Sequence, residues 1–248
     1  MSQWFFVSDL HGFASRYQKL FQVILKEMPA VVLMGGDLLP HGISSHGKKN
    51  RRDFIHAVLV DGFERLKAQL SQDYPQVFLI LGNDDPRAEE ARLTQAETQG
   101  LWEYLHARAV RCGAFTVYGY ACIPPTPFLL KDWERYDVSR FVDPGCISPE
   151  EGWRSVSVPA HVIRHATIQA DLENLVQGAD LSRAVFLFHS PPYQTTLDRA
   201  ALDGRTIDGV PLDVHVGSIA IRRFILERQP RITLHGHIHE SARLTGSW

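Results

Sequence analysis

The chain has 248 residues, of which 44% are hydrophobic and 22% are charged, and its formal net charge is -2. This length is enough for one domain with a sizeable core, and the near-neutral charge gives no global attraction to nucleic acid or anionic lipid. The three cysteines form no Cys-x-x-Cys pair, and no apolar run approaches the ~18 residues of a membrane helix, so a disulfide framework, a thiolate zinc site and a membrane span are excluded.

Short apolar runs alternate with helical patterns along the chain, which indicates a layered α/β fold with crossover connections. The predicted strands are Trp4–Val7, Val31–Met34, Val77–Leu81, Val185–Phe188 and Ile232–Leu234. The predicted helices cover Arg16–Lys26, Asp53–Leu70, Ile168–Val176 and a segment after Ser218, which we expect to act as the N-cap. We expect a single domain over residues 1–248, and a cytoplasmic location because the first strand leaves no room for a signal peptide.

Three segments do not fit this alternation. Thr116–Ile123 has strand character and is predicted to belong to a second sheet. His41–Arg52 and Pro124–Pro159 are irregular, and the second is too long for a plain connection in a compact domain. We therefore interpret residues 124–159 as an insertion that forms a lid or a binding loop.

Polar side chains follow each of the five predicted main strands, at the point where the strand ends. These segments are Ser8-Asp9-Leu10-His11-Gly12, Gly35-Gly36-Asp37, Gly82-Asn83-Asp84-Asp85, His189-Ser190, and His235-Gly236-His237-Ile238-His239. Ligands of α/β sheets bind at the carboxyl ends of the strands, so we expect these side chains to converge.

The spacing of these residues predicts a metal centre. In an extended chain residues i and i+2 point the same way, which would bring Asp9 to His11 and His237 to His239. Imidazole nitrogen mixed with carboxylate and amide oxygen favours manganese, with iron or zinc as alternatives, over calcium. Two such ions about 3.5–4 Å apart can clamp a phosphate and lower the pKa of a bridging water.

The ordered set Asp-x-His, Gly-Asp, Gly-Asn, His and Gly-His-x-His resembles the calcineurin-like metallophosphoesterases, in particular a prokaryotic branch with Gly-Asn-Asp in place of Gly-Asn-His. The resemblance implies a four-layer α/β/β/α sandwich with mixed sheets and attack on the substrate by a metal-bridging hydroxide. It also implies that Asp37 bridges two divalent ions. The implied ligands of one ion are Asp9, His11 and His239, and those of the other are Asn83, His189 and His237.

The implied catalytic residues are His11, Asp84 and Asp85, and here the chain departs from the family. Most relatives carry a histidine where this chain has Asp84, positioned to protonate the leaving oxygen. A carboxylate beside two cations is expected to stay ionised at neutral pH and to be a poor acid. The alternative is that Asp84 only fills a turn. We therefore expect a preference for phosphodiesters with good leaving groups. His41 or His215 is an alternative acid.

Several functional alternatives stay open at this point. A scaffold protein on the same fold would have no need for seven converging polar residues, and a nuclease would normally carry a broad basic face. The basic cluster Lys48–Arg52 is too short to form such a face. A phosphomonoesterase is the remaining alternative. The aromatic residues Trp133, Tyr136, Phe141 and Trp153 could stack on a base, although covering the core is their default role. A small phosphate ester is the favoured partner.

Only nine residues, Glu240–Trp248, follow His239, whereas relatives usually continue through further strands. We therefore expect the second sheet to be incomplete at the C-terminus, or its exposed edge to pair with another copy of the chain.

Overall fold

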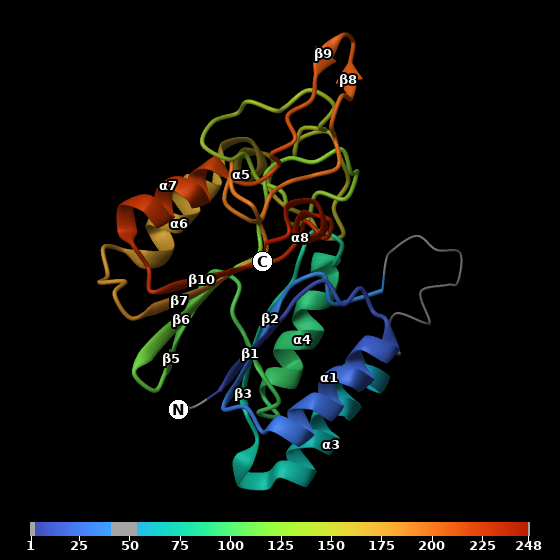
Figure 1. Ribbon diagram of the computed structural model, residues 1–248, viewed down its shortest axis with the longest axis vertical. Coiled ribbons are helices and arrows are strands. Elements are labelled where there is room, and N and C mark those ends of the chain that lie inside the picture. The colour runs from blue at the N-terminus through green and yellow to red at the C-terminus, as the bar shows by residue number, and fades with distance from the viewer. Residues whose placement is uncertain (1–2, 41–53, 248) are drawn as a thin grey trace.

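Two β-sheets pack face to face in the computed structural model, which describes residues 3–40 and 54–247, and helices cover their outer faces (Figure 1). The first sheet is wholly parallel and has the strand order β1 (Trp4–Val7), β2 (Val31–Gly35), β3 (Gln76–Ile80), β4 (Glu103–Tyr104). The second is mixed, with the order β10 (Ile232–His235), β7 (Ala184–Phe188), β6 (Phe115–Tyr120), β5 (Arg108–Cys112). In this second sheet β5 runs antiparallel to β6, and the other two pairs are parallel.

Helices form the two outer layers of the sandwich (Figure 1). The first sheet is covered by α1 (Ala14–Glu27), α3 (Asp61–Leu70) and α4 (Glu90–Glu97), with the π-helical turn η1 (Ile55–Val60) leading into α3. The second sheet is covered by α6 (Ile168–Val176) and α7 (Ile219–Arg228). The shorter elements are η2 (Ser71–Asp73), η3 (Arg87–Glu89), α5 (Ala160–His165), the hairpin β8 (Thr206–Ile207) and β9 (Val210–Pro211), and α8 (Ser241–Thr245). Among the described residues no helix has both the length and the apolar character needed to cross a membrane.

This architecture confirms the predicted four-layer α/β/β/α sandwich. The central strands β2 and β7 are buried along their whole length, as continuous apolar runs require when both faces of a sheet are covered. The predicted strand over 116–123 lies in the second sheet as expected, but it ends at Tyr120. Ser218 accepts a hydrogen bond from the Ile221 amide and caps α7, also as predicted.

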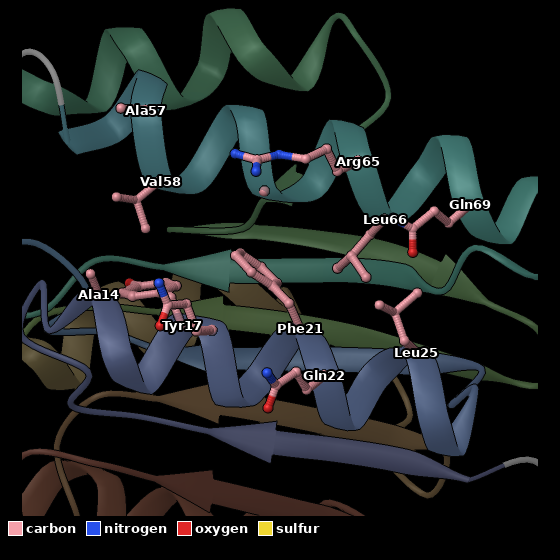
Figure 2. A pocket seen from close by; sticks show the side chains of 12 residues that line it. Ala14, Tyr17, Phe21, Gln22, Leu25, Ala57, Val58, Arg65, Leu66 and Gln69 are labelled. Atoms are coloured by element: carbon pink, nitrogen blue, oxygen red, sulfur yellow. The ribbon is translucent and has the colours of Figure 1, made fainter.

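The groove between α1 and α3 encloses a hollow of about 310 Å³ (Figure 2). Phe21 and Leu25 line it from α1, and Leu66 lines it from α3. A Cβ atom at Gly62 would collide with the outer edge of the Phe21 ring, so a side chain there would require this ring to move. No described residue that lines the hollow is an acid or a histidine, so it offers no metal ligands.

Residues 124–159 form isolated bridges but no helix or strand. A buried ion pair stabilises this segment: the Lys131 Nζ atom lies 2.6 Å from Glu134 Oε2, and both side chains are fully buried. Lys131 also donates to the Thr126 carbonyl oxygen, and Glu134 accepts from the Thr126 amide. Burial raises the pKa of Glu134 to about 7, although the charge of Lys131 opposes this rise.

Lys131→Met is expected to lower the free energy of unfolding by about 3–5 kcal/mol at pH 8, because it leaves Glu134 charged, buried and without its cation. The loss should be smaller at pH 5.5. Without Lys131 the pKa of Glu134 in the folded state rises further above its ordinary value of 4.5. Ionisation of Glu134 then costs the folded state more free energy as the pH increases from 4.5 toward this raised pKa. Urea unfolding at both pH values measures this. The double variant Lys131→Met/Glu134→Leu should recover much of the loss, and equal losses at both pH values would contradict the account.

Candidate metal centre

The carboxyl ends of five strands meet at one side of the sandwich. Backbone hydrogen bonds fix the loops that leave these strands: the amides of Asp9 and His11 donate to the carbonyls of Gly36 and Asp37, at 3.0 and 2.7 Å. The Gly236 amide donates to the His189 carbonyl at 3.0 Å. The loops of the first sheet and those of the second are therefore each held in register before any ligand binds.

All seven predicted metal ligands converge there. Asp9, His11, Asp37 and His239 form one group of donor atoms within 4.8 Å of one another, and Asp37, His189 and His237 form a second. Asp37 belongs to both groups, as expected for a bridging ligand. The seventh residue, Asn83, places its Oδ1 atom 3.0 Å from His189 Nε2, so it joins the second group.

Nitrogen and oxygen atoms that could bind a metal lie at short range from one another in both groups. In the first, His239 Nε2 lies 2.9 Å from His11 Nε2 and 3.2 Å from Asp9 Oδ1. In the second, His189 Nε2 lies 3.4 Å from Asp37 Oδ2, while its Nδ1 atom donates to the Gly35 carbonyl at 2.8 Å. That second bond leaves Nε2 facing the other donors. The mixed donor set therefore fits a borderline divalent cation in each group.

The charges in the site favour cation binding. Burial opposes ionisation of Asp37, but the positive charge of His189 and a hydrogen bond with it lower the Asp37 pKa. For His189 the burial effect is likewise outweighed by the Asp37 carboxylate, which raises the His189 pKa to about 10. Burial and the charge of His189 lower the pKa of His237 to about 4, so its ring is neutral at pH 7. A divalent cation bound by the carboxylates would compete with the His189 proton.

Four of the seven predicted ligands have left-handed backbone conformations. The φ angles are 57° at Asp9, 48° at His11, 52° at Asp37 and 77° at His237. Tight turns therefore bring Asp9 and His11 together. The prediction that an extended chain would do so is wrong. Such conformations are sparsely populated by residues other than glycine and cluster at functional sites.

Two glycines give the ligands the space they need. A Cβ atom at Gly82 would collide with Asp37 Oδ1, and one at Gly236 would collide with the Ser8 hydroxyl and crowd Asp9 Oδ2. Both glycines lie beside the converging donors, so a side chain at either position would displace a predicted ligand.

The two acids after Asn83 lie in different surroundings. Asp85 is fully buried, and its carboxylate accepts hydrogen bonds from the amides of Leu38, Leu39 and Gly82 at 2.7–3.0 Å. Burial and the nearby Asp37 raise its pKa. These contacts favour a role in fixing the Asp37 loop, and a direct catalytic role for Asp85 stays a prediction. Asp84 Oδ2 lies 3.6 Å from His11 Nδ1.

The other candidates lie outside the two groups. His235 is on β10, where its ring stacks on Phe188, as expected for a core residue. His215 Nδ1 lies 2.8 Å from Asp198 in the loop after β7. Trp133 is buried and donates to the Asp85 carbonyl, whereas Phe141 and Trp153 are exposed. His41 and the basic cluster Lys48–Arg52 lie outside the described residues.

Arg16 is a candidate that the sequence analysis missed. Its guanidinium donates to the Asp9 carbonyl at 2.7 Å, and it lines a hollow of about 420 Å³ together with Asp9 and His239. It therefore places a cation beside the first group. The only signal in the sequence is its position on the helix that follows the Asp-x-His motif.

Comparisons with known proteins show the family and the fold of the chain. The family model described as calcineurin-like phosphoesterase matches residues 5–241. One solved structure has 18% identity and a TM-score of 0.54, over 94% of this chain and 82% of its own. Another, the protein TT1561 of Thermus thermophilus, has 16% identity and a TM-score of 0.51, over 93% and 79%. No curated protein matches, and these structural likenesses bear on the fold alone. Because this family model matches nearly the whole chain, the chain belongs to the calcineurin-like phosphoesterase family.

Proposed function

We propose that the protein hydrolyses a small phosphodiester with the help of two divalent ions, for which Mn²⁺ is favoured and iron or zinc are alternatives. Membership of the family implies metal-dependent hydrolysis of phosphoesters. The observation that carries the two-ion proposal is the position of Asp37 in both donor groups. A carboxylate shared in this way offsets the repulsion between two cations.

The chain's own residues would have distinct tasks. Asp9, His11, Asp37 and His239 would hold one ion, and Asp37, Asn83, His189 and His237 would hold the other. Ions bound there supply an activated water and neutralise charge on the phosphate oxygens. Arg16 would add a positive charge at the rim beside Asp9, where an anionic substrate enters.

The absence of an imidazole at position 84 supports a diester with a good leaving group, because protonation of the leaving oxygen then matters less. The net charge of -2 supports a small substrate over duplex nucleic acid. Phosphomonoesterase activity, nuclease activity and a catalytically weak scaffold are the alternatives, and a substrate panel separates them.

With Mn²⁺ present, the protein is expected to hydrolyse an activated aryl phosphodiester and to act only weakly on alkyl phosphomonoesters. His11→Ala should abolish this turnover, because it removes a ligand from the first group. Steady-state rates over a panel of aryl diesters, cyclic nucleotides, dinucleotides and monoesters measure the preference. A wild-type protein that binds two ions but hydrolyses nothing in the panel would support the scaffold alternative.

Association between copies and a cytoplasmic location stay predictions. Within the described residues, β10 pairs with β7 alone and is an edge strand of the second sheet, the sheet for which pairing with another copy was predicted. The first sheet has a similar edge strand, β1, which pairs with β2 alone. Its residues Trp4, Phe5, Phe6 and Val7 line an apolar hollow of about 470 Å³. We propose that another copy pairs at such an edge. Light scattering of the purified protein tests this, and a monomer at all concentrations would contradict it.

A further inference from the structure

We propose that Asp84 is a positioning residue that orients one ligand in each metal group at the same time, through its two carboxylate oxygens. The inference rests on the proposed function, since it assigns Asp84 a task toward the metal ligands. Asp84 stands where the family's Gly-Asn-His pattern has a histidine, and the proposed role differs from that of a general acid.

The first contact is with His11. The Nε2 atom of this ring faces the first group, at 2.9 Å from His239 Nε2 and 4.0 Å from Asp37 Oδ2. The opposite ring atom, Nδ1, faces Asp84 Oδ2 at 3.6 Å. The Asp84 carboxylate therefore lies beside the ring nitrogen that does not face His239. A carboxylate in this place favours the proton on Nδ1 and leaves the Nε2 lone pair for a metal ion.

The second contact is with Asn83. Its side-chain Nδ2 donates to Asp84 Oδ1 at 3.2 Å, and its Oδ1 atom lies 3.0 Å from His189 Nε2. An amide group has one oxygen and one nitrogen on opposite sides. The bond to Asp84 therefore turns the oxygen, which is the ligating atom, toward the second group.

The backbone of Asp84 is itself held by the bridging residue. The Asp84 amide donates to Asp37 Oδ1 at 2.8 Å. The residue is thus linked to His11 of the first group, to Asn83 of the second, and to Asp37, which both groups share. A histidine at position 84 could not present an acceptor to both neighbours in this way, because a neutral imidazole has a single acceptor nitrogen, whereas Asp84 turns one carboxylate oxygen to each.

The ring of His189 is also oriented through its Nδ1 atom, but its partner is a backbone carbonyl and not a side chain. His189 donates its Nδ1 proton to the Gly35 carbonyl, a backbone group that needs no particular side chain. His11 instead faces a side chain, so its orientation depends on the residue type at position 84. Partners of this kind behind ligating residues typically change metal affinity by about 10- to 100-fold.

The test is a titration of metal-stripped protein with Mn²⁺, in which electron paramagnetic resonance reports the free ion. Wild-type protein should bind two ions. Asp84→Ala should weaken both by about 10- to 100-fold, because both contacts are lost. Asp84→Asn should weaken one ion only, since its amide has one oxygen and can serve only one of the two neighbours. Glu240→Gln is the control: it removes an equal charge beside His239, but Glu240 accepts from the Ala201 amide and not from a predicted ligand, so affinity should stay within about twofold.

A second arm separates positioning from direct ligation. In a His11→Ala background, Asp84→Ala should cause no further loss at the first site, because its effect there passes through His11. An equal further loss would mean that Asp84 is itself a ligand and would overturn the proposal, as would wild-type affinity in Asp84→Ala. Urea unfolding of each variant checks the fold, and Asp84→Asn answers the question if the alanine variant does not fold. Failure of the wild-type protein to bind Mn²⁺ would instead count against the proposed function.

Discussion

Asp37→Asn is expected to leave the protein folded but to remove most of its bound metal and to lower diester turnover by roughly 10³-fold or more. Asp37 is the residue shared by both donor groups, and its ionised carboxylate is what offsets the repulsion between two cations. An amide supplies an oxygen but no charge. Metal ions contribute several kcal/mol of transition-state stabilisation, and a loss of about 4 kcal/mol corresponds to about 10³-fold in rate. Elemental analysis and steady-state rates with an aryl phosphodiester measure the two effects.

Asp137→Asn provides the matched control for this prediction. Asp137 is another acid with several hydrogen bonds, from the Ser218 hydroxyl and the first amides of α7, those of Ile219 and Ala220. It belongs to neither donor group. Its substitution should reduce stability by about 1 kcal/mol and leave metal content unchanged. If Asp37→Asn kept two bound ions and near wild-type turnover, Asp37 would not be a bridging ligand.

The sequence predicts the layers of the fold and the place of the site well, because both depend on local patterns. Continuous apolar runs require strands buried on both faces, and β2 and β7 are buried in this way. Polar residues directly after such strands must then lie at one edge of the sheets. The position of Asp37 between two groups follows from this topology.

Contacts between distant segments could not be predicted in the same way. No sequence pattern indicated that the Asp85 carboxylate is bonded to three amides, two of which lie in the segment after Asp37. The buried Lys131–Glu134 pair gives no sequence signal, because charged residues are ordinarily exposed. The left-handed turns at Asp9 and His11 were also missed, since neither residue type requires them.

His237→Ala is expected to reduce bound Mn²⁺ from two ions to one and to lower diester turnover to background. His237 lies in the second group with Asp37 and His189, and burial keeps its ring neutral at pH 7, so its lone pair is available to a metal ion. Its backbone amide, which donates to Asp9 Oδ1 at 3.1 Å, is retained in the variant. The first group should therefore keep its geometry and its ion. Elemental analysis gives the stoichiometry, and the rate with an aryl phosphodiester gives the activity.

His235→Phe is the matched control, two residues earlier in the chain, at the end of β10. The His235 ring stacks on Phe188 at 5.5 Å between ring centroids, and its Nδ1 atom lies 2.9 Å from the Ser190 carbonyl oxygen. Burial lowers its pKa to about 4, so it too is a neutral imidazole. Both rings are partly exposed, and the two histidines differ mainly in their contacts. Phenylalanine keeps the stack and loses two hydrogen bonds, the one to Ser190 and one of 2.9 Å between Nε2 and the Thr233 hydroxyl, which should cost about 1–3 kcal/mol of stability and no metal. If the His235 variant lost an ion and the His237 variant kept both, the assignment of ligands after β10 would be wrong. If only the His237 variant lost an ion, the position of His237 would identify it as a ligand, since both rings are partly exposed and both are neutral at pH 7.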